Sequence, residues 1–171
     1  MKTCLDRSEA GTRSTGCPPP DVLKGRIVAV VDGDTIKVRR GRKTITVRMI
    51  GIDTPETKKP GTAVECGGPE ATKNLKRLAF HNGEGRRVTL TTDPSQDRKD
   101  RYGHLLAYAK VSGGKTLQVA QLKAGWATVY VYDNKPFERY AQFRDLAIGA
   151  YQAERGAWGK CDGDFHQPQS G

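Results

Sequence analysis

Short runs of alternating apolar and polar residues mark the first third of the globular part of the chain. Residues 22–31 are rich in β-branched side chains, and an Asp-Gly pair at 32–33 separates them from the alternating stretch 35–38. An Asp-Gly turn between two such runs is a strong β-hairpin signal. A further glycine turn leads into 44–50. We therefore predict three meandering strands within residues 22–52.

After residue 68 the apolar positions recur at helical spacing in three places. Pro69 suits the first turn of the first helix, and Gly83 lies just past its end. Two runs with β character separate the first helix from the second. The predicted helices cover 69–82, 117–124 and 136–155, and the predicted strands cover 86–92 and 104–111.

Five strands with a helix between the third and the fourth match the connectivity of an OB-fold barrel. We therefore expect a mainly β protein with added helices (α+β), built as a five-stranded OB-fold barrel with three helices. Residues 1–20 are polar and end in three prolines, which indicates a flexible arm. The expected domain covers 21–160, and a tail of residues 161–171 follows, disordered from Gly163 onward.

The chain has 171 residues, enough for one domain with a sizeable core. It carries 29 Lys and Arg against 19 Asp and Glu, a formal charge of +10. A surplus of this size favours a polyanionic partner, with nucleic acid first and an anionic membrane surface second. The alternative is a basic protein with no such partner. No apolar run approaches the roughly 18 residues of a membrane-spanning helix.

The four cysteines are Cys4, Cys17, Cys66 and Cys161. None has the close spacing of a zinc site or a redox motif. They are either four reduced thiols or two disulfides with three possible connectivities. We favour Cys4 with Cys17, which would staple a polar segment, and Cys66 with Cys161, which would tie the end of the chain to its middle.

Stable disulfides need an oxidising compartment. Residues 1–10 nevertheless lack the apolar core of a secretory signal, because Asp6, Arg7 and Glu9 interrupt it. Two interpretations remain open: a cytoplasmic protein, or a mature secreted or cell-surface form to which a start methionine was added. We expect the second.

Carboxylates concentrate at two predicted strand ends. Asp34 begins the second strand and Asp53 follows the third, so neighbouring strands bring both to one rim of the barrel. Two carboxylates and a backbone carbonyl form a hard oxygen site suited to calcium or magnesium. Pro55 biases Thr54 toward an extended conformation that aims its carbonyl at such an ion. Glu56 adds a third carboxylate. Taken singly, each acid is equally well explained as a turn or cap residue.

Arg48 supplies a fixed bidentate cation for phosphate. Strict strand alternation places Arg48 and Asp53 on opposite faces of the strand. The two side chains can meet only if the strand bends near Gly51.

These stretches together resemble the staphylococcal nuclease (thermonuclease) family over about residues 22–160. The similar segments, in order, are Val31-Asp32-Gly33-Asp34-Thr35, Arg48 through Glu56, Gly68-Pro69-Glu70-Ala71, Asp100 through Tyr108, and Gly156-Ala157-Trp158. The resemblance implies a monomeric OB-fold endonuclease that uses calcium to hydrolyse DNA and RNA and leaves 3'-phosphate ends.

By this resemblance Asp34 and Asp53 are the calcium carboxylates and Thr54 is the carbonyl ligand. Glu56 orients or deprotonates the attacking water, and Arg48 binds the phosphate. These roles agree with the residue types, because a cation on a non-bridging oxygen stabilises the charge-rich transition state.

The resemblance also assigns substrate contacts. Tyr102, Tyr130 and Tyr132 correspond to the lining of the nucleotide pocket, where tyrosines offer stacking faces and hydroxyl donors. Apart from the resemblance, Arg101 lies in the basic and polar run 97–101, which is either a solvated loop or, through charge attraction, a contact to the substrate backbone. Secreted members of the family often pair cysteines placed like Cys66 and Cys161.

One position departs from the family pattern. Active members carry a second catalytic arginine after the Tyr-Gly motif, and this chain carries His104 there. Histidine is only fractionally charged near pH 7 and has fewer donors. Three outcomes are open: His104 acts as a protonated donor or general acid, Arg101 or Arg98 partly substitutes, or the protein binds nucleic acid or a protein partner without cleaving. We assign no role to His166, which lies in the expected tail.

Overall fold

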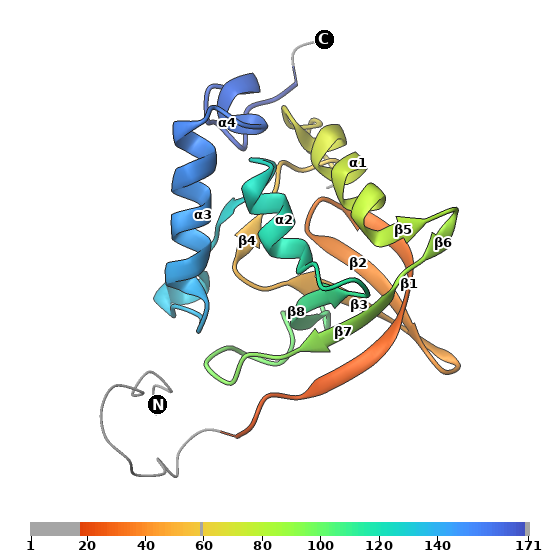
Figure 1. The fold of residues 1–171 in the computed structure, drawn as a ribbon. Coiled ribbons are helices and arrows are strands. Elements are labelled where there is room, and N and C mark those ends of the chain that lie inside the picture. Colours follow the sequence, from red (N-terminus) through yellow and green to blue (C-terminus); the bar gives the residue numbers. More distant parts are fainter. Residues whose placement is uncertain (1–17, 59, 170–171) are drawn as a thin grey trace, which may run out of the picture.

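The computed structural model describes residues 18–58 and 60–169 (Figure 1). The expected arm lies almost wholly outside the described residues, and so do Cys4 and Cys17. Five strands close a barrel in the order β1-β2-β3-β8-β7. The pairing of β3 with β8 is parallel and every other pairing in the barrel is antiparallel. The barrel strands are β1 (Val22–Asp32), β2 (Thr35–Arg40), β3 (Lys43–Met49), β7 (Arg87–Thr91) and β8 (Leu105–Val111). This confirms the predicted barrel.

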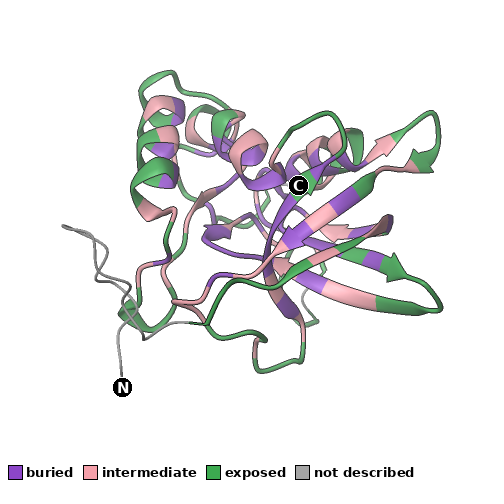
Figure 2. Cartoon of the chain, turned by 60° about the horizontal axis from the view of Figure 1, so that its bottom comes forward, coloured by how far each residue is buried: buried purple, intermediate pink, exposed green. Residues whose placement is uncertain are grey.

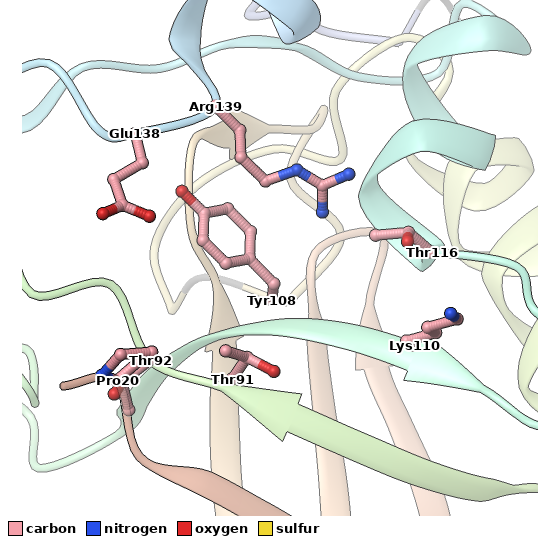
Figure 3. A pocket seen from close by; sticks show the side chains of 8 residues that line it. All are labelled: Pro20, Thr91, Thr92, Tyr108, Lys110, Thr116, Glu138 and Arg139. Carbon is pink, nitrogen blue, oxygen red and sulfur yellow. The ribbon is translucent and has the colours of Figure 1, made fainter. Parts of the chain in front are cut away.

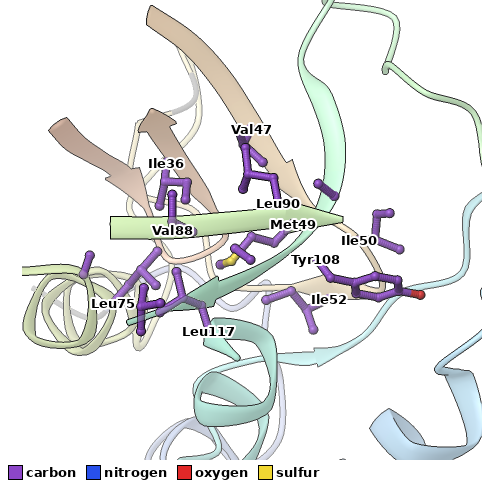
Figure 4. Packing of buried hydrophobic residues seen from close by; sticks show 14 of the residues in the cluster. Ile36, Val47, Met49, Ile50, Ile52, Leu75, Val88, Leu90, Tyr108 and Leu117 are labelled. Carbon is purple, nitrogen blue, oxygen red and sulfur yellow. The ribbon is translucent and has the colours of Figure 1, made fainter. Parts of the chain in front are cut away.

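Alternation along the strands separates the core from the outer wall. In β2, Ile36 and Val38 are fully buried, whereas Lys37 and Arg39 are exposed. The inward side chains of the strands pack on Leu75 of helix α1 and on Leu117 of helix α2 (Figure 4). Buried residues therefore line the middle of the barrel, while the ends of the long hairpins are exposed (Figure 2).

The helices lie together on one side of the barrel (Figure 1). Two short strand pairs, β4 with β9 and β5 with β6, complete the fold. A fourth helix follows the three that were predicted, so the expected number of helices is wrong. The remaining elements are α1 (Gly68–Ala79), α2 (Leu117–Lys123), α3 (Tyr140–Gln152), α4 (Ala157–Lys160), the 3-10 turn η1 (Tyr132–Asn134), β4 (Ile52–Asp53), β5 (Phe80–His81), β6 (Glu84–Gly85) and β9 (Thr128–Val129).

Helix α3 begins four residues later than the predicted helix over 136–155. Phe137 is buried, and its ring lies 5.3 Å from that of Phe143. The Glu138 N–H donates to Asp93 at 2.8 Å. These contacts hold residues 136–139 outside the helix, because they satisfy the backbone and the apolar ring in a different conformation.

The segment from Gly163 to Gln169 packs on the domain, so the expectation of a disordered tail is wrong for residues 163–169. Phe165 is buried against Trp158. The Cys66 N–H donates to the Gln167 carbonyl at 2.7 Å, and the Gln169 N–H donates to the Val64 carbonyl at 2.8 Å. This pairing places the segment beside the loop that precedes α1.

A disulfide joins Cys66 to Cys161 across a sequence separation of 95 residues, as predicted. Closing a loop of that length stabilises a fold by on the order of 4–5 kcal/mol in the chain-entropy model. No helix among the described residues combines the length and the apolar character that a membrane crossing requires.

Candidate active site

The turn between β1 and β2 places Asp34 inside the protein. Its side chain is buried, with 2% relative exposure, and its Oδ1 accepts the Thr35 hydroxyl at 2.8 Å. The preceding Gly33 packs tightly, because a Cβ there would lie 2.6 Å from the Thr54 hydroxyl. The buried Gln121 amide donates to the Gly33 carbonyl at 2.7 Å. Helix α2 thus holds the turn that carries the first predicted carboxylate.

A sharp bend at Gly51 brings Arg48 and Asp53 together. Gly51 has φ +80°, and a Cβ there would lie 2.4 Å from the Phe137 ring, so only glycine fits. Beyond the bend Asp53 turns back, and Arg48 Nη2 lies 2.9 Å from both Asp53 Oδ1 and Asp34 Oδ2. The chain therefore bends near Gly51, which is the condition under which strand alternation allows Arg48 and Asp53 to meet. We call Asp34, Arg48 and Asp53 the carboxylate–arginine cluster.

The cluster holds more negative than positive charge. Burial raises the pKa of Asp34 well above its usual value; Arg48 opposes this rise, and Asp32 and Asp53 add to it. Burial alone would lower the pKa of Arg48, but Asp34 and Asp53 outweigh it and raise that pKa. Two carboxylates, with Asp32 nearby, therefore share one guanidinium, an arrangement that favours a second cation.

The donor chemistry fits a hard cation such as calcium, because the nearby ligands are carboxylate and backbone oxygens. Among residues 18–58 and 60–169, however, no three His, Cys, Asp or Glu side chains converge as a ready metal site. Arg48 lies between the two carboxylates instead. The Thr54 N–H donates to Asp34 Oδ2 at 3.3 Å, which keeps the Thr54 backbone beside the cluster.

Glu56 lies in the loop that follows the cluster. Its Oε1 accepts the N–H groups of Thr57 and Lys58 at 2.9 Å each. The Glu56 N–H donates to Glu65 Oε2 at 2.6 Å, and the Glu65 N–H returns a bond to the Glu56 carbonyl at 2.9 Å. Glu65, which the sequence reasoning missed, thus holds the backbone of the predicted catalytic carboxylate.

His166 also reaches this place, although the sequence assigned it no role. Its Nε2 lies 3.5 Å from Asp53 Oδ2, and its Nδ1 lies 3.3 Å from Glu65 Oε1. No local motif marks this histidine. The signal that could have placed it was the pairing of Cys66 with Cys161, because that bond brings the following residues beside the loop of Glu65.

The predicted second cation lies on a separate loop. Asp100 Oδ1 accepts the N–H groups of Tyr102 and His104 at 2.9 Å each, and Asp100 Oδ2 lies 2.9 Å from His104 Nδ1. Arg101 stacks over the Tyr102 ring at 4.8 Å and donates to its hydroxyl at 2.7 Å. We call residues 100–104 the tyrosine loop. Within the described residues, no hydrogen bond or ion pair links its side chains to the carboxylate–arginine cluster.

The other two tyrosines lie after β9. The Tyr130 N–H donates to the Gly51 carbonyl at 3.0 Å, and Asp53 pairs with Thr128 in β4–β9. Tyr130 and Tyr132 are both exposed. The backbone therefore ties Tyr130 to the bend that positions Asp53, and its ring faces solvent.

A separate hollow of about 230 Å³ lies between β8 and the start of α3 (Figure 3). Tyr108 lines it and donates to Asp93 at 2.5 Å, and Arg139 lies over the Tyr108 ring at 5.2 Å. Burial and the bond to Asp93 raise the pKa of Tyr108, so its hydroxyl stays protonated. None of the sequence-predicted site residues lines this hollow.

A closed five-stranded barrel with an α-helix between its third strand and β7 defines an OB-fold protein. The buried Asp34 and the partly buried Asp53 lie beside Arg48 at the end of its β2–β3 ladder. Residues 46–160 match the family model described as staphylococcal nuclease homologue. This match covers more than half of the chain, and the chain belongs to that family.

Similar curated proteins include two from Bacillus subtilis (strain 168). The chain is 43% identical to SPbeta prophage-derived endonuclease YokF over 132 residues. The aligned residues make up 76% of this chain and 42% of YokF. It is 47% identical to Endonuclease YncB over 116 residues, which make up 67% of this chain and 51% of YncB. It is also 45% identical to Thermonuclease of Staphylococcus hyicus over 96 residues, which make up 56% of this chain and 53% of that thermonuclease. The chain spans about half the length of these relatives.

Proposed function

We propose that this protein is a calcium-dependent endonuclease that hydrolyses phosphodiester bonds in DNA and RNA and leaves 3'-phosphate ends. The observation that carries the proposal is the carboxylate–arginine cluster, in which Arg48 lies 2.9 Å from both Asp34 and Asp53. A surplus of acids next to one guanidinium, with Asp34 buried, suits a site for a divalent cation and a phosphate. The names of the similar proteins support the same activity.

Calcium would be held by the carboxylates of Asp34 and Asp53 and by the Thr54 carbonyl. When bound, it would neutralise phosphate charge and lower the cost of the charge-rich transition state. With the acids engaged in this way, Arg48 exchanges its carboxylate partners for the non-bridging phosphate oxygens, which its planar fork matches.

Glu56 is the proposed acceptor of the proton from the attacking water. Two backbone N–H groups hold its Oε1, which leaves Oε2 as the oxygen for this task. Glu65 positions it, because its Oε2 accepts the Glu56 N–H and its own N–H donates to the Glu56 carbonyl. His104 is the proposed donor on the other side of the phosphate. Its Nδ1 lies 2.9 Å from Asp100 Oδ2, which leaves Nε2 as the atom proposed to donate to the substrate.

Exposed aromatic groups supply the proposed substrate contacts. Tyr102, Tyr130 and Tyr132 offer faces for base stacking, and Arg101 adds a cation beside Tyr102. We also propose a monomeric, secreted or cell-surface protein, because the Cys66–Cys161 disulfide is typical of oxidising compartments.

A second candidate is a module that binds nucleic acid or a protein partner without cleaving. His104 favours it, because loss of one preorganised transition-state donor typically costs about 10²–10³ in rate. The retained acids favour the enzyme, since binding alone has no need of them.

Incubation of the purified protein with plasmid and with single-stranded DNA and RNA, in calcium or in chelator, tests the proposal. We expect cleavage only with calcium, 3'-phosphate ends, and strong loss with Glu56→Gln. If the protein binds nucleic acid but does not cleave it anywhere between about pH 6 and about 9, the second candidate is established instead. Cleavage that persists in chelator would remove calcium from the proposal.

A further inference from the structure

The outer wall of the barrel is basic over a continuous area. The five barrel strands contain nine Lys and Arg residues and one acid, Asp32, which lies at the active-site end. Charges of both signs usually intersperse on a protein surface. Here a single sign gathers on one sheet.

Three arginines face one another across this sheet. Arg26 on the central strand β1 pairs in register with Arg39 on β2 and with Arg87 on β7. Residues directly opposite in antiparallel strands have Cβ atoms about 4.5–5.5 Å apart, and like charges in such pairs are destabilising. The row therefore lowers the stability of the fold, and a bound anion would reduce that cost.

Few groups within the protein neutralise this row. Glu84 lies 3.7 Å from Arg26, but its side chain is 82% exposed. Arg39, Arg87 and the neighbouring Lys37 form no ion pair and no side-chain hydrogen bond with any described residue. This differs from Arg48, which two carboxylates hold. The side chains of Lys37, Arg39 and Arg87 therefore remain available to a ligand, whereas Arg26 also donates to the Gly85 carbonyl at 2.9 Å.

The row is continuous with the active site along β2. Thr35 lies opposite Arg48 in the β2–β3 ladder, and Lys37 and Arg39 follow at two-residue steps on the same face. At about 3.3 Å per residue, Arg39 lies about 13 Å beyond Thr35. The β2–β3 hairpin points away from α3, so the helix does not cover this path (Figure 1).

We propose that Lys37, Arg39, Arg26 and Arg87 form an extended binding track for the phosphodiester backbone of nucleic acid, outside the linkage that is cleaved. The track deepens the proposed function and rests on it. It contacts phosphates without reading sequence, and it retains long chains at the active site. One OB fold commonly covers about 4–16 nucleotides, a length that reaches from the cluster to the arginine row.

The test compares two triple variants of equal charge. Lys37→Gln, Arg39→Gln and Arg87→Gln together remove the track and leave the cluster intact. The matched control, Lys73→Gln, Lys123→Gln and Arg144→Gln, removes one exposed cation from each of α1, α2 and α3. Binding of single-stranded oligonucleotides of about 16 and about 4 nucleotides is followed by fluorescence anisotropy in chelator, over a range of salt concentrations.

We expect the track variant to bind the longer oligonucleotide at least about tenfold more weakly at low salt, with a salt slope smaller by about 2, since each lost contact contributes about 0.7. The short probe and the control variant should change little. Equal losses in the two variants would reduce the effect to net charge and overturn the track. Loss of binding to phosphatidylserine vesicles, with binding to oligonucleotides unchanged, would assign the surface to a membrane and also overturn it.

Cleavage of the short oligonucleotide in calcium separates this inference from the proposed function. If the wild type does not cleave it, the proposed enzyme fails while the binding comparison still decides the track. If both triple variants cleave it like the wild type and the track variant still binds the long probe normally, the track alone is wrong.

Discussion

The carboxylate–arginine cluster and the tyrosine loop each carry a cation proposed to contact the scissile phosphate, and they hold it differently. Arg48 is bound by acids from two other places in the chain, one of them buried. His104 is bound by Asp100, four residues earlier in the same loop. The first arrangement depends on the barrel, whereas the second is local. We therefore expect substitutions at position 104 to disturb the fold less than substitutions at position 48.

The largest expected effect belongs to Arg48→Ala. Turnover should fall by about 10²–10³, because a preorganised transition-state donor is lost. The melting temperature should also fall, since Asp34 and Asp53 lose their counter-charge inside the protein. Arg98→Ala is the control, because Arg98 pairs with Asp21 at the surface. Similar melting temperatures for the two variants would break the comparison.

Calcium binding should depend on the cluster and not on the loop. A ligand that binds only the folded state stabilises that state by about 2.7 kcal/mol when its free concentration is about 100 times its dissociation constant. We expect calcium to raise the melting temperature of the wild type and of His104→Ala, and to have no effect on Asp34→Ala. Calorimetry with and without chelator measures this. A calcium response that survives in Asp34→Ala would contradict the assigned ligands.

His104→Arg should raise turnover by at least about tenfold, within the range for one transition-state donor. The two activities are compared from about pH 6 to about 9, a range over which arginine stays fully charged. In an Arg48→Ala background the same substitution should restore little, since the two cations have different geometries. Equal activity of wild type and variant across this pH range would show that position 104 takes no part in catalysis.

The smallest expected effect belongs to Asp100→Asn. The amide oxygen can still accept backbone bonds, but the charged contact to His104 is lost, which costs about 1 kcal/mol. A change of that size shifts the melting temperature of a domain of this length by about 2–4 °C. Amide exchange at Tyr102 and His104 should quicken while the barrel strands stay protected. Faster exchange throughout β3 would show that the loop and the cluster are coupled after all.

The barrel and most of the cluster were accessible from sequence. The alternating apolar residues in 22–50 and the Asp-Gly turn specify strands and a hairpin. These elements are predictable because they depend on residues that are close together in the sequence. The acids and Arg48 lie in dense motifs at predicted strand ends. The cysteines predicted the bond between Cys66 and Cys161.

Long-range contacts decided the rest. The bend at Gly51, against which the Phe137 ring packs, lets Arg48 meet Asp53. His166 reaches Asp53 and Glu65 because chain segments about 100 residues apart pair side by side, and no local pattern carries that information. The row of Arg26, Arg39 and Arg87 likewise exists only in the register of three strands, since these residues are scattered charges until the barrel closes.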